Sequence, residues 1–564
     1  MSARALLLRL LSVLLPLALA PSLYLYLYPV FRGCAFALPA QNPPSRNLQA
    51  VLNTLRQHIA PQSAAQPAPF RLLILADPQL EGDTSLPSPD DELLPRLRGH
   101  WAAISSSAQS AQSPLDAAVV TNITVAARSL VVDDLPRALR GVRKRVDLLG
   151  NDFYLAHIYR ALHWWTVPTH VTVLGDLVGS QWVSDEEFEW RGRRFWDRVF
   201  RGGERVDDEI TASSGERGEE GDTGTVADAD SAWARKIINV AGNHDIGYAG
   251  DVSGARMERF ERVFGRANWD VRFEYPHSFG AGGQNSSHTS TPPTLHLINL
   301  NSLTLDTPPL DQDIQTNSYA YLSELITRRS RPVEDRSSFT LLLTHVPLHK
   351  NAGVCTDGPR FVFHESDDED SPDGTPRFRE GGLEEQNHLS DHVSANGVLQ
   401  GIFGMNGNEE GPGGGWGRNG LVLTGHDHTG CDVVHFVNRS VAGDAVADGA
   451  QNSWEWSARR YSEPREREPT PSIREVTLRS MMGEFGGNAG LLSLWFDADP
   501  AVNEWKYEIS TCAAGVQHIW WAVHVLDVIA VGLLLVYLVS GQTRSKPVGV
   551  QNARAGRAKT QKTE

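Results

Sequence analysis

The chain has 564 residues, enough for one large domain with insertions or for two ordinary domains. Its formal charge at pH 7 is −16, which argues against a nucleic-acid partner because nucleic-acid-binding proteins normally present a basic face. The charge is uneven, since acidic runs occupy 219–230 and 364–374 while residues 540–564 hold six Lys or Arg and one Glu. We interpret the acidic runs as solvated loops.

The first predicted element is an apolar segment at residues 5–30, preceded by a short N-terminus at 1–4. It is long enough to cross a bilayer core of roughly 30 Å. A cleaved signal peptide is the alternative, because Ala18 and Ala20 resemble a small-residue cleavage site. Pro21 would follow that cut and the apolar run continues beyond it. We therefore favour an uncleaved membrane anchor.

A second apolar segment, residues 518–539, lies near the C-terminus, with His524 and Asp527 as its ionisable residues. The basic tail that follows it marks the cytosolic side by the positive-inside rule. Two spans then place both termini in the cytosol. A connector at 31–69 and a domain at 70–516 are left in the lumen of a secretory compartment.

Between the spans, short apolar runs alternate with longer polar or helical stretches. Runs rich in Leu, Val or Ile predict central strands that are buried on both faces. These strands are expected at 71–76, 171–175, 236–240, 294–300, 339–344 and 421–424. Apolar residues at three- and four-residue spacing predict a helix at 142–165, and a second helix is expected at 255–264.

Three segments, near 202–232, 364–418 and 442–470, interrupt this alternation. They are rich in Gly, Ser, Asp, Glu, Pro and Arg and show little apolar periodicity. We predict that they are surface insertions and largely disordered.

Polar residues of metal-ligand type follow five of the predicted strands, at the edge where open α/β sheets usually place their sites. They are Asp77, Asp176, Asn243, His345, His426 and His428. Carboxylate, amide and imidazole ligands suit Mn, Fe, Zn or Mg, and the lack of a thiolate argues against a structural zinc site. One Asp can bridge two cations a few Å apart, the arrangement used for displacement at phosphorus. We expect two divalent metal ions, with Mn as the first choice.

The strings ADPQLEGD, GDLVGSQW, GNHDIGY, THVPLHK and TGHDHTGCD resemble the calcineurin-like metallophosphoesterase superfamily. Within it they are similar to the endoplasmic-reticulum enzymes that remodel glycosylphosphatidylinositol (GPI) anchors, and to the fungal branch in particular. The resemblance implies an α/β fold in which a two-sheet sandwich is flanked by helices, with one transmembrane helix at each end. It also implies a phosphodiesterase of the endoplasmic-reticulum membrane that removes an ethanolamine-phosphate group from a GPI mannose. GPI glycolipid or GPI-anchored proteins, the bilayer and cargo-sorting machinery are the partners it implies.

The resemblance also implies roles for individual residues. The first metal would be held by Asp77 and His428 and the second by Asn243, His345 and His426, with Asp176 bridging the two. His244 would stabilise the phosphoryl oxygens or protonate the leaving alkoxide. Asp245 would orient His244 or stabilise the turn.

One position departs from the superfamily pattern, because Gln79 stands where a His is usual. A Gln carbonyl can bind a hard cation, but more weakly than imidazole binds a transition metal. The identity and the occupancy of the first metal therefore depend on Gln79. Two other functions stay open: a metallophosphoesterase with another lipid or nucleotide substrate, and a non-catalytic factor that retains the fold to bind GPI cargo.

Four cysteines fit a lumenal domain, since Cys34 and Cys512 lie next to the two spans and Cys355 and Cys431 each follow a ligand motif. An oxidising compartment would permit the pairs Cys34–Cys512 and Cys355–Cys431, although four cysteines allow three pairings and the sequence does not choose. Glycosylation sequons occur at Asn122, Asn285 and Asn438. Their number is what chance gives, so they are compatible with a lumenal domain without arguing for it.

Overall fold

The computed structural model describes most of the chain. The described residues are 3–39, 46–82, 86, 88–110, 113, 116–212, 232–275, 292–329, 331–365, 376–439, 454–464 and 469–542. They belong to two compact units, Met1–Tyr26 with His518–Glu564, and Leu27–Gln517.

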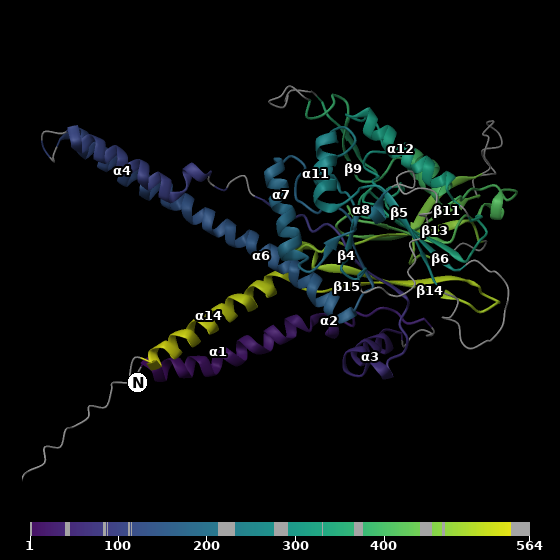
Figure 1. Ribbon diagram of the computed structural model, residues 1–564, viewed down its shortest axis with the longest axis horizontal. Coiled ribbons are helices and arrows are strands. Elements are labelled where there is room, and N and C mark those ends of the chain that lie inside the picture. Colours follow the sequence, from purple (N-terminus) through teal and green to yellow (C-terminus); the bar gives the residue numbers. More distant parts are fainter. Residues whose placement is uncertain are drawn as a thin grey trace, which may run out of the picture. The chain divides into compact units, whose positions relative to one another are not determined.

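The larger unit is built on two main β-sheets (Figure 1). The first has the order β15-β14-β1-β2-β4-β3, and its central strands β1, β2 and β4 are parallel. Its strands are β1 (Phe70–Leu75), β2 (His170–Val173), β3 (Glu204–Arg205), β4 (Lys236–Asn239), β14 (Asn488–Asp497) and β15 (Glu504–Ala513).

The second sheet has the order β12-β11-β13-β10-β7-β6-β5, with β6, β7, β10 and β13 parallel to one another. Its strands are β5 (Trp269–Glu274), β6 (Thr294–Asn299), β7 (Ser338–Leu343), β10 (Gly420–Thr424), β11 (Cys431–Asn438), β12 (Glu455–Arg460) and β13 (Ser472–Thr477). A separate two-stranded sheet pairs β8 (Phe361–Phe363) with β9 (Leu383–Gln386).

The core lies between the two main sheets. Alternate residues of β1 (Leu72 and Ile74) belong to the same buried cluster as Leu341 and Leu343 of β7 and Leu423 of β10. These side chains are fully buried, and each contributes about 1.5–3 kcal/mol relative to an exposed position. The sequence therefore forms a two-sheet sandwich, because the central strands carry apolar residues on the face that meets the other sheet.

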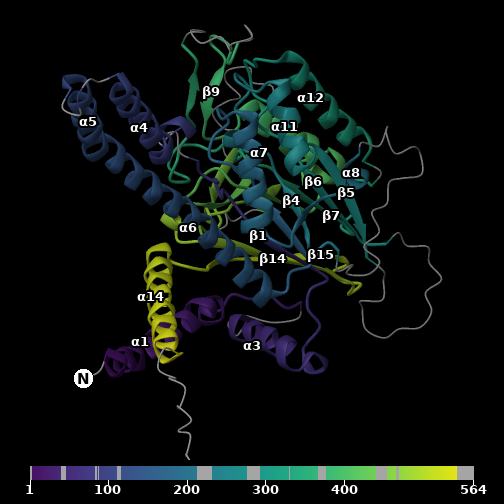
Figure 2. The ribbon, with the colours of Figure 1, turned by 60° about the vertical axis from the view of Figure 1, so that its left-hand side comes forward.

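Helices cover the outside of the larger unit (Figures 1 and 2). They are α2 (Tyr28–Phe31), α3 (Arg46–Ile59), α4 (Leu93–Ser110), α5 (Ala117–Ser129), α6 (Leu135–Thr166), α7 (Asp185–Arg194), α8 (Asp208–Thr211), α11 (Gly254–Phe264) and α12 (Gln312–Thr327). The short helix α10 (Asn243–Ile246) is mostly buried. The buried residues of α6 are concentrated from Leu148 onwards, so its second half packs against the domain. α5 continues through the π-helical segment Leu130–Asp134 into α6, and α4 packs beside α5, away from the sheets (Figure 2).

The smaller unit contains the two apolar helices α1 (Ala3–Tyr26) and α14 (Gln517–Gln542), each long and apolar enough to cross a membrane. They pair in antiparallel fashion. Ser22, near the end of α1, donates a hydrogen bond to Asp527 (Oγ–Oδ2 2.8 Å), and Arg4, near its start, lies over the ring of Tyr537. The role of Asp527 that the sequence leaves open is thus at least a polar contact with the partner helix.

The six predicted strands and both predicted helices are confirmed. The strands lie within two residues of their expected ends, whereas the helix expected at 142–165 begins earlier, at Leu135. The connector contains a helix, α3, that composition alone did not indicate.

The prediction of disordered insertions is wrong wherever the structure describes those segments. Residues 376–418 contain β9 and the π-helical segment Val393–Ile402, while β12 lies within 442–470 and both β3 and α8 lie within 202–232. Leu383 and Ile402 are fully buried, which explains the order. A few apolar anchors can fix a segment whose average composition is polar. The other residues of the three insertions lie outside the described ranges.

Candidate metal centre

Every predicted ligand lies within a few residues of the carboxyl end of a strand. Asp77 follows β1, Asp176 follows β2, and Asn243 begins α10 after β4. From the second sheet, His345 follows β7 and both His426 and His428 follow β10. Because the sandwich brings the carboxyl ends of these parallel strands to one edge, residues far apart in sequence meet there.

The ligands form two groups that share one carboxylate. Asp176, His345 and His426 have ligand atoms within 4.8 Å of one another, and so do Asp77, Asp176 and His428. Asp176 belongs to both groups. Its Oδ1 lies 3.3 Å from Nε2 of His345, while its Oδ2 lies 3.0 Å from Nε2 of Gln79. One Asp carboxylate facing two cation positions is the geometry that a bridging ligand needs.

Backbone carbonyls orient both imidazoles of the group formed by Asp176, His345 and His426. Nδ1 of His345 lies 2.7 Å from the carbonyl of Leu174, and Nε2 of His426 lies 2.8 Å from the carbonyl of Gln386. A proton on each of those nitrogens leaves the opposite ring nitrogen as a lone-pair donor. Those opposite nitrogens lie 2.9 Å and 3.0 Å from Oδ1 of Asn243, so Asn243 completes this group.

The ligand turns are tight and carry backbone strain. Asp77, Gln79, Asp176 and His426 all have positive φ angles, between 41° and 69°. Non-glycine residues adopt such angles only where the surrounding structure holds them there, and such positions cluster at functional sites. Gly175 precedes Asp176 with φ 89°, and a Cβ at this position would lie 2.2 Å from Nδ1 of His345. Glycine is therefore required for the strand to approach the imidazole.

The electrostatics of the centre favour cations. Burial, followed by the charge of Asp176, raises the pKa of Asp77 well above its ordinary value. Burial would raise the pKa of Asp176 too, but neighbouring groups, His244 above all with its charge and its backbone N–H, outweigh it and lower the pKa to about 2. Burial lowers the pKa of His426 to about 3, which keeps that imidazole neutral.

The residues of the centre have the charge and the ligand atoms that divalent cations need. Oδ2 of Asp77 is buried and has no hydrogen-bond partner among the described residues. An ionised carboxylate oxygen in that position is costly unless a positive charge compensates it. Buried carboxylates, neutral imidazoles and an amide oxygen are together the ligands of Mn, Fe, Zn or Mg.

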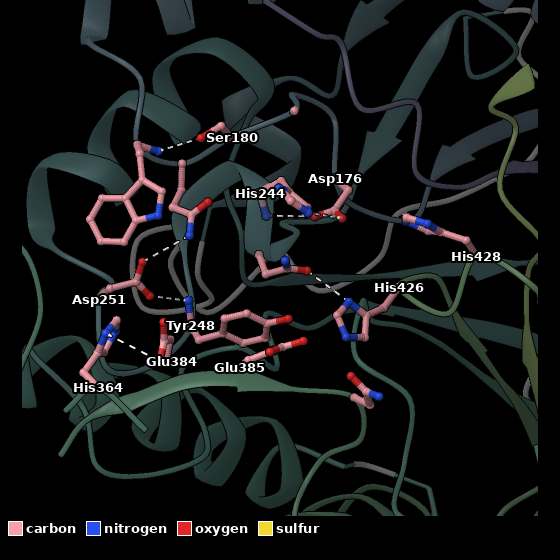
Figure 3. A pocket seen from close by; sticks show the side chains of 15 residues that line it. Asp176, Ser180, His244, Tyr248, Asp251, His364, Glu384, Glu385, His426 and His428 are labelled. Atoms are coloured by element: carbon pink, nitrogen blue, oxygen red, sulfur yellow. Dashed lines mark hydrogen bonds and ion pairs between the residues drawn. The ribbon is translucent and has the colours of Figure 1, made fainter. Parts of the chain in front are cut away.

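His244 and Asp245 take different positions. His244 lies at the surface of the site, with Nε2 3.8 Å from Oδ2 of Asp176, and its backbone N–H donates to Oδ1 of Asp176 (2.9 Å) (Figure 3). Asp245 is fully buried, and its carboxylate accepts hydrogen bonds from the backbone N–H groups of Val178 (2.9 Å) and Gly242 (2.8 Å). This geometry supports the turn-stabilising alternative for Asp245 rather than an orienting contact with the imidazole of His244.

A pocket of about 440 Å³ opens directly onto the centre (Figure 3). Its walls include Asp176, Asn243, His244, His426 and His428. The remaining lining residues are Gly179, Ser180, Gln181, Trp182, Tyr248, Asp251, His364, Glu384, Glu385 and Asn387. Predicted ligands therefore line a cavity that is large enough for a small substrate group.

Sequence reasoning missed the outer wall of this pocket. Tyr248 ends the GNHDIGY string and Asp251 lies three residues after it, so both could have been found from their closeness to that motif. Glu384, Glu385 and the carbonyl of Gln386 belong to β9 or its end, in a segment that composition assigned to disorder. The signal there was a short apolar anchor, Leu383, within a polar run.

The cysteines and sequons are placed as follows. Disulfides join Cys34 to Cys512 and Cys355 to Cys431, the pairing that the sequence allowed but did not select. The second disulfide ties the loop after β7 to the start of β11, beside the His426 turn. Among the sequons, Asn122 lies on α5 and Asn438 ends β11, both at solvent-accessible positions, whereas Asn285 lies outside the described residues.

A two-sheet α/β sandwich with two ligand groups sharing an Asp defines a class of metal-binding proteins suited to phosphoester chemistry. No family model matches the chain. Protein TED1 of Saccharomyces cerevisiae is 32% identical over 410 residues, which cover 67% of this chain and 75% of that protein. An uncharacterized protein of Schizosaccharomyces pombe is 26% identical over 416 residues, covering 67% of this chain and 78% of that protein. Metallophosphoesterase 1 of Danio rerio is 22% identical over 323 residues, covering 55% of this chain and 64% of that protein. The chain belongs to the calcineurin-like metallophosphoesterase family, with TED1 among its relatives.

Proposed function

We propose that the chain is a metal-dependent phosphodiesterase of the endoplasmic-reticulum membrane. It removes an ethanolamine-phosphate group from a mannose of GPI anchors and so supports the remodelling and export of GPI-anchored proteins. The observation that carries the proposal is the pair of ligand groups sharing Asp176 at the floor of an open pocket. The GPI substrate comes from the motif resemblance.

Two divalent cations, Mn being the first choice, would supply Lewis-acid polarisation of the phosphoryl group and a water of lowered pKa. The chain itself supplies the rest. Asp176 belongs to both ligand groups, and Asn243 places its amide oxygen 2.9 Å and 3.0 Å from the inward-facing ring nitrogens of His345 and His426. His244 lines the pocket beside Asp176, where its imidazole can donate a hydrogen bond to a phosphoryl oxygen or a proton to a leaving alkoxide.

The far wall of the pocket supports a substrate with a cationic group. Glu384 and Glu385 line the wall; Arg360 pairs with Glu385 (3.3 Å) from outside the pocket, and no Lys or Arg is among the described lining residues. Their side chains are half exposed, so they can exchange water for a ligand. A primary ammonium next to the phosphate, as in phosphoethanolamine, complements such a surface electrostatically.

The apolar helices support the membrane part of the proposal. Antiparallel pairing of α1 and α14 puts both chain ends at the same end of the pair, and the basic tail then favours the cytosol for both. In this topology the metallophosphoesterase domain is lumenal, where both disulfides are stable.

The test uses the full-length chain purified in detergent and loaded with Mn²⁺. Two p-nitrophenyl phosphodiesters are compared, one carrying ethanolamine and the other ethanol. We expect hydrolysis of both by the wild type, and a loss of about 100-fold or more in Asp176→Asn and His426→Ala. The double change of Glu384→Gln and Glu385→Gln should raise KM for the ethanolamine diester alone, which makes it the matched control for the ligand variants.

Mass spectrometry of GPI glycans from cells lacking the protein decides the substrate. Retained ethanolamine-phosphate on mannose is the expected result, and an unchanged glycan profile would leave a phosphoesterase with another lipid or nucleotide substrate. Gln79 favours a second candidate, a non-catalytic GPI-cargo factor that works with sorting machinery, because it weakens one ligand group. Equal inactivity of wild type and Asp176→Asn across several metals would select that candidate.

A further inference from the structure

Gln79 occupies the ligand group of Asp77, Asp176 and His428 in a specific orientation. Its side-chain nitrogen Nε2 lies 3.0 Å from Oδ2 of Asp176 and 3.2 Å from Nε2 of His428. Both contacted residues, Asp176 and His428, belong to that group. The amide is therefore hydrogen-bonded to two of the three residues that would hold a cation there.

The chemistry of the two neighbours fixes which end of the amide points inward. A carboxylate oxygen accepts hydrogen bonds and cannot donate one, and a neutral imidazole nitrogen that faces a metal site is a lone-pair acceptor. Only the NH₂ end of Gln79 satisfies both, since the carbonyl end would oppose two acceptors. Asn and Gln orientations are assigned from the hydrogen-bond network in this way.

The backbone holds Gln79 in this place. Its N–H donates to the carbonyl of Asp176 (2.8 Å), and the next residue, Leu80, donates to the carbonyl of Leu177 (3.1 Å). The positive φ of 41° adds to the constraint, because the turn has little freedom to withdraw the side chain. A cation entering this group must displace both hydrogen bonds of the amide and rotate it before the carbonyl oxygen can face the site.

The other group is built differently. Asp176, Asn243, His345 and His426 offer four ligand atoms, and backbone carbonyls already orient both imidazoles. Its donors face inward without a competing NH₂ group among the described residues. Oriented ligands of this kind strengthen metal binding by about 10- to 100-fold.

We propose that Gln79 makes the metal centre unequal: one cation is held firmly by Asp176, Asn243, His345 and His426, and a second binds weakly because the Gln79 amide competes for Asp176 and His428. Gln79 is thus a positioning residue that holds the shared carboxylate while the weak position is empty. The inference deepens the proposed phosphodiesterase by stating how its two cations differ.

The experiment measures binding, not turnover. The full-length chain in detergent is stripped with a chelator and titrated with MnCl₂ alone, with isothermal calorimetry and electron paramagnetic resonance as readouts. Wild type should show two steps that differ by at least about tenfold in affinity. Gln79→His should tighten the second step by about 10- to 100-fold and give the spectrum of an exchange-coupled Mn pair at lower total Mn.

Two further variants control the result. Gln181→His makes the same chemical change in the same pocket, where Gln181 contacts Asp251 and not the centre, and it should leave both steps unchanged. His428→Ala should abolish the weak step and preserve the firm one. Equal affinities of the two steps in wild type, or a second step unmoved by Gln79→His, would overturn the inference while leaving a metal-dependent hydrolase intact. Failure of wild type to bind any Mn²⁺ would overturn both.

Discussion

His244 and Asp245 are neighbours in sequence whose side chains serve different parts of the centre. The imidazole of His244 faces the pocket, while the carboxylate of Asp245 accepts two backbone N–H groups beneath the turn. We expect His244→Ala to retain the metals and the fold but to lower kcat by about 10²- to 10⁴-fold, because a positioned proton donor is lost. Asp245→Asn should instead destabilise the turn by about 1–3 kcal/mol, because an NH₂ group must then face a backbone donor. Elemental analysis, thermal unfolding and steady-state kinetics on both variants separate the two roles.

A loss of metal in His244→Ala, or a normal melting temperature with reduced turnover in Asp245→Asn, would contradict this division.

The same pair of residues shows where sequence reasoning ends at the residue scale. Ligand types behind apolar strands predict the members of the centre because strand ends are fixed by local patterning. The hydrogen bond from the backbone of Val178 to Asp245 and the one between the side chains of Gln79 and His428 join residues that are far apart in sequence. They depend on the tertiary fold, and no pattern of neighbouring residues predicts them.

The loop after β7, which carries the THVPLHK motif, is anchored to two strands of the second sheet by buried charges. Glu475 of β13 accepts a hydrogen bond from the N–H of Leu348 (2.9 Å), pairs with Nζ of Lys350 (3.1 Å) and contacts Nε2 of His435 on β11 (2.6 Å). Burial would raise the pKa of Glu475, but the charge of Lys350 and the hydrogen bond with His435 outweigh it and lower the pKa to about 2. The network therefore stabilises the loop that presents His345.

A carboxylate with a lowered pKa stabilises the fold at pH values above its ordinary pKa of 4.5, and this stability is lost as the pH falls toward about 2. We expect the free energy of unfolding to drop across that window, and Glu475→Gln to flatten the drop. At pH 7 the variant should lose about 3–5 kcal/mol, because Lys350 is left buried without its partner. Glu258→Gln, at a mostly exposed position, is the control. An identical pH profile in wild type and Glu475→Gln would refute the role of the network.

At the scale of elements, periodicity identified central strands better than edge strands. β1, β2, β4, β6, β7 and β10 are continuous apolar runs, whereas β12 and β15 have half-exposed faces that mix charged and apolar residues. The two-stranded sheet of β8 and β9 was missed for a related reason, since its stability comes from a few buried residues such as Leu383 within a polar segment. Whether such segments form strands depends on the strands they pair with, and a single sequence does not identify those partners.

At the scale of the whole molecule, the two apolar helices and the Cys34–Cys512 disulfide involve opposite ends of the chain. Cys34 lies shortly after α1 and α2, and Cys512 lies in β15 shortly before α14, at a sequence separation of 478. A cross-link between segments so distant restricts the unfolded chain strongly, and such links form in oxidising compartments. The stability that this disulfide contributes therefore depends on the proposed placement of the domain in the oxidising lumen.

A lumenal domain with cytosolic termini makes the two described sequons directly informative. Asn122 lies on α5 and Asn438 ends β11, and both are accessible to a glycosylating enzyme only if the domain faces the lumen. We expect endoglycosidase H to increase the electrophoretic mobility of the wild type, and Asn122→Gln and Asn438→Gln each to remove part of that shift. In sealed microsomes, added protease should remove a C-terminal tag and leave the domain protected. A digested domain with a protected tag would reverse the topology. A wild type with neither glycan nor protease protection would exclude a lumenal site, because protease protection depends on which side of the membrane the domain occupies.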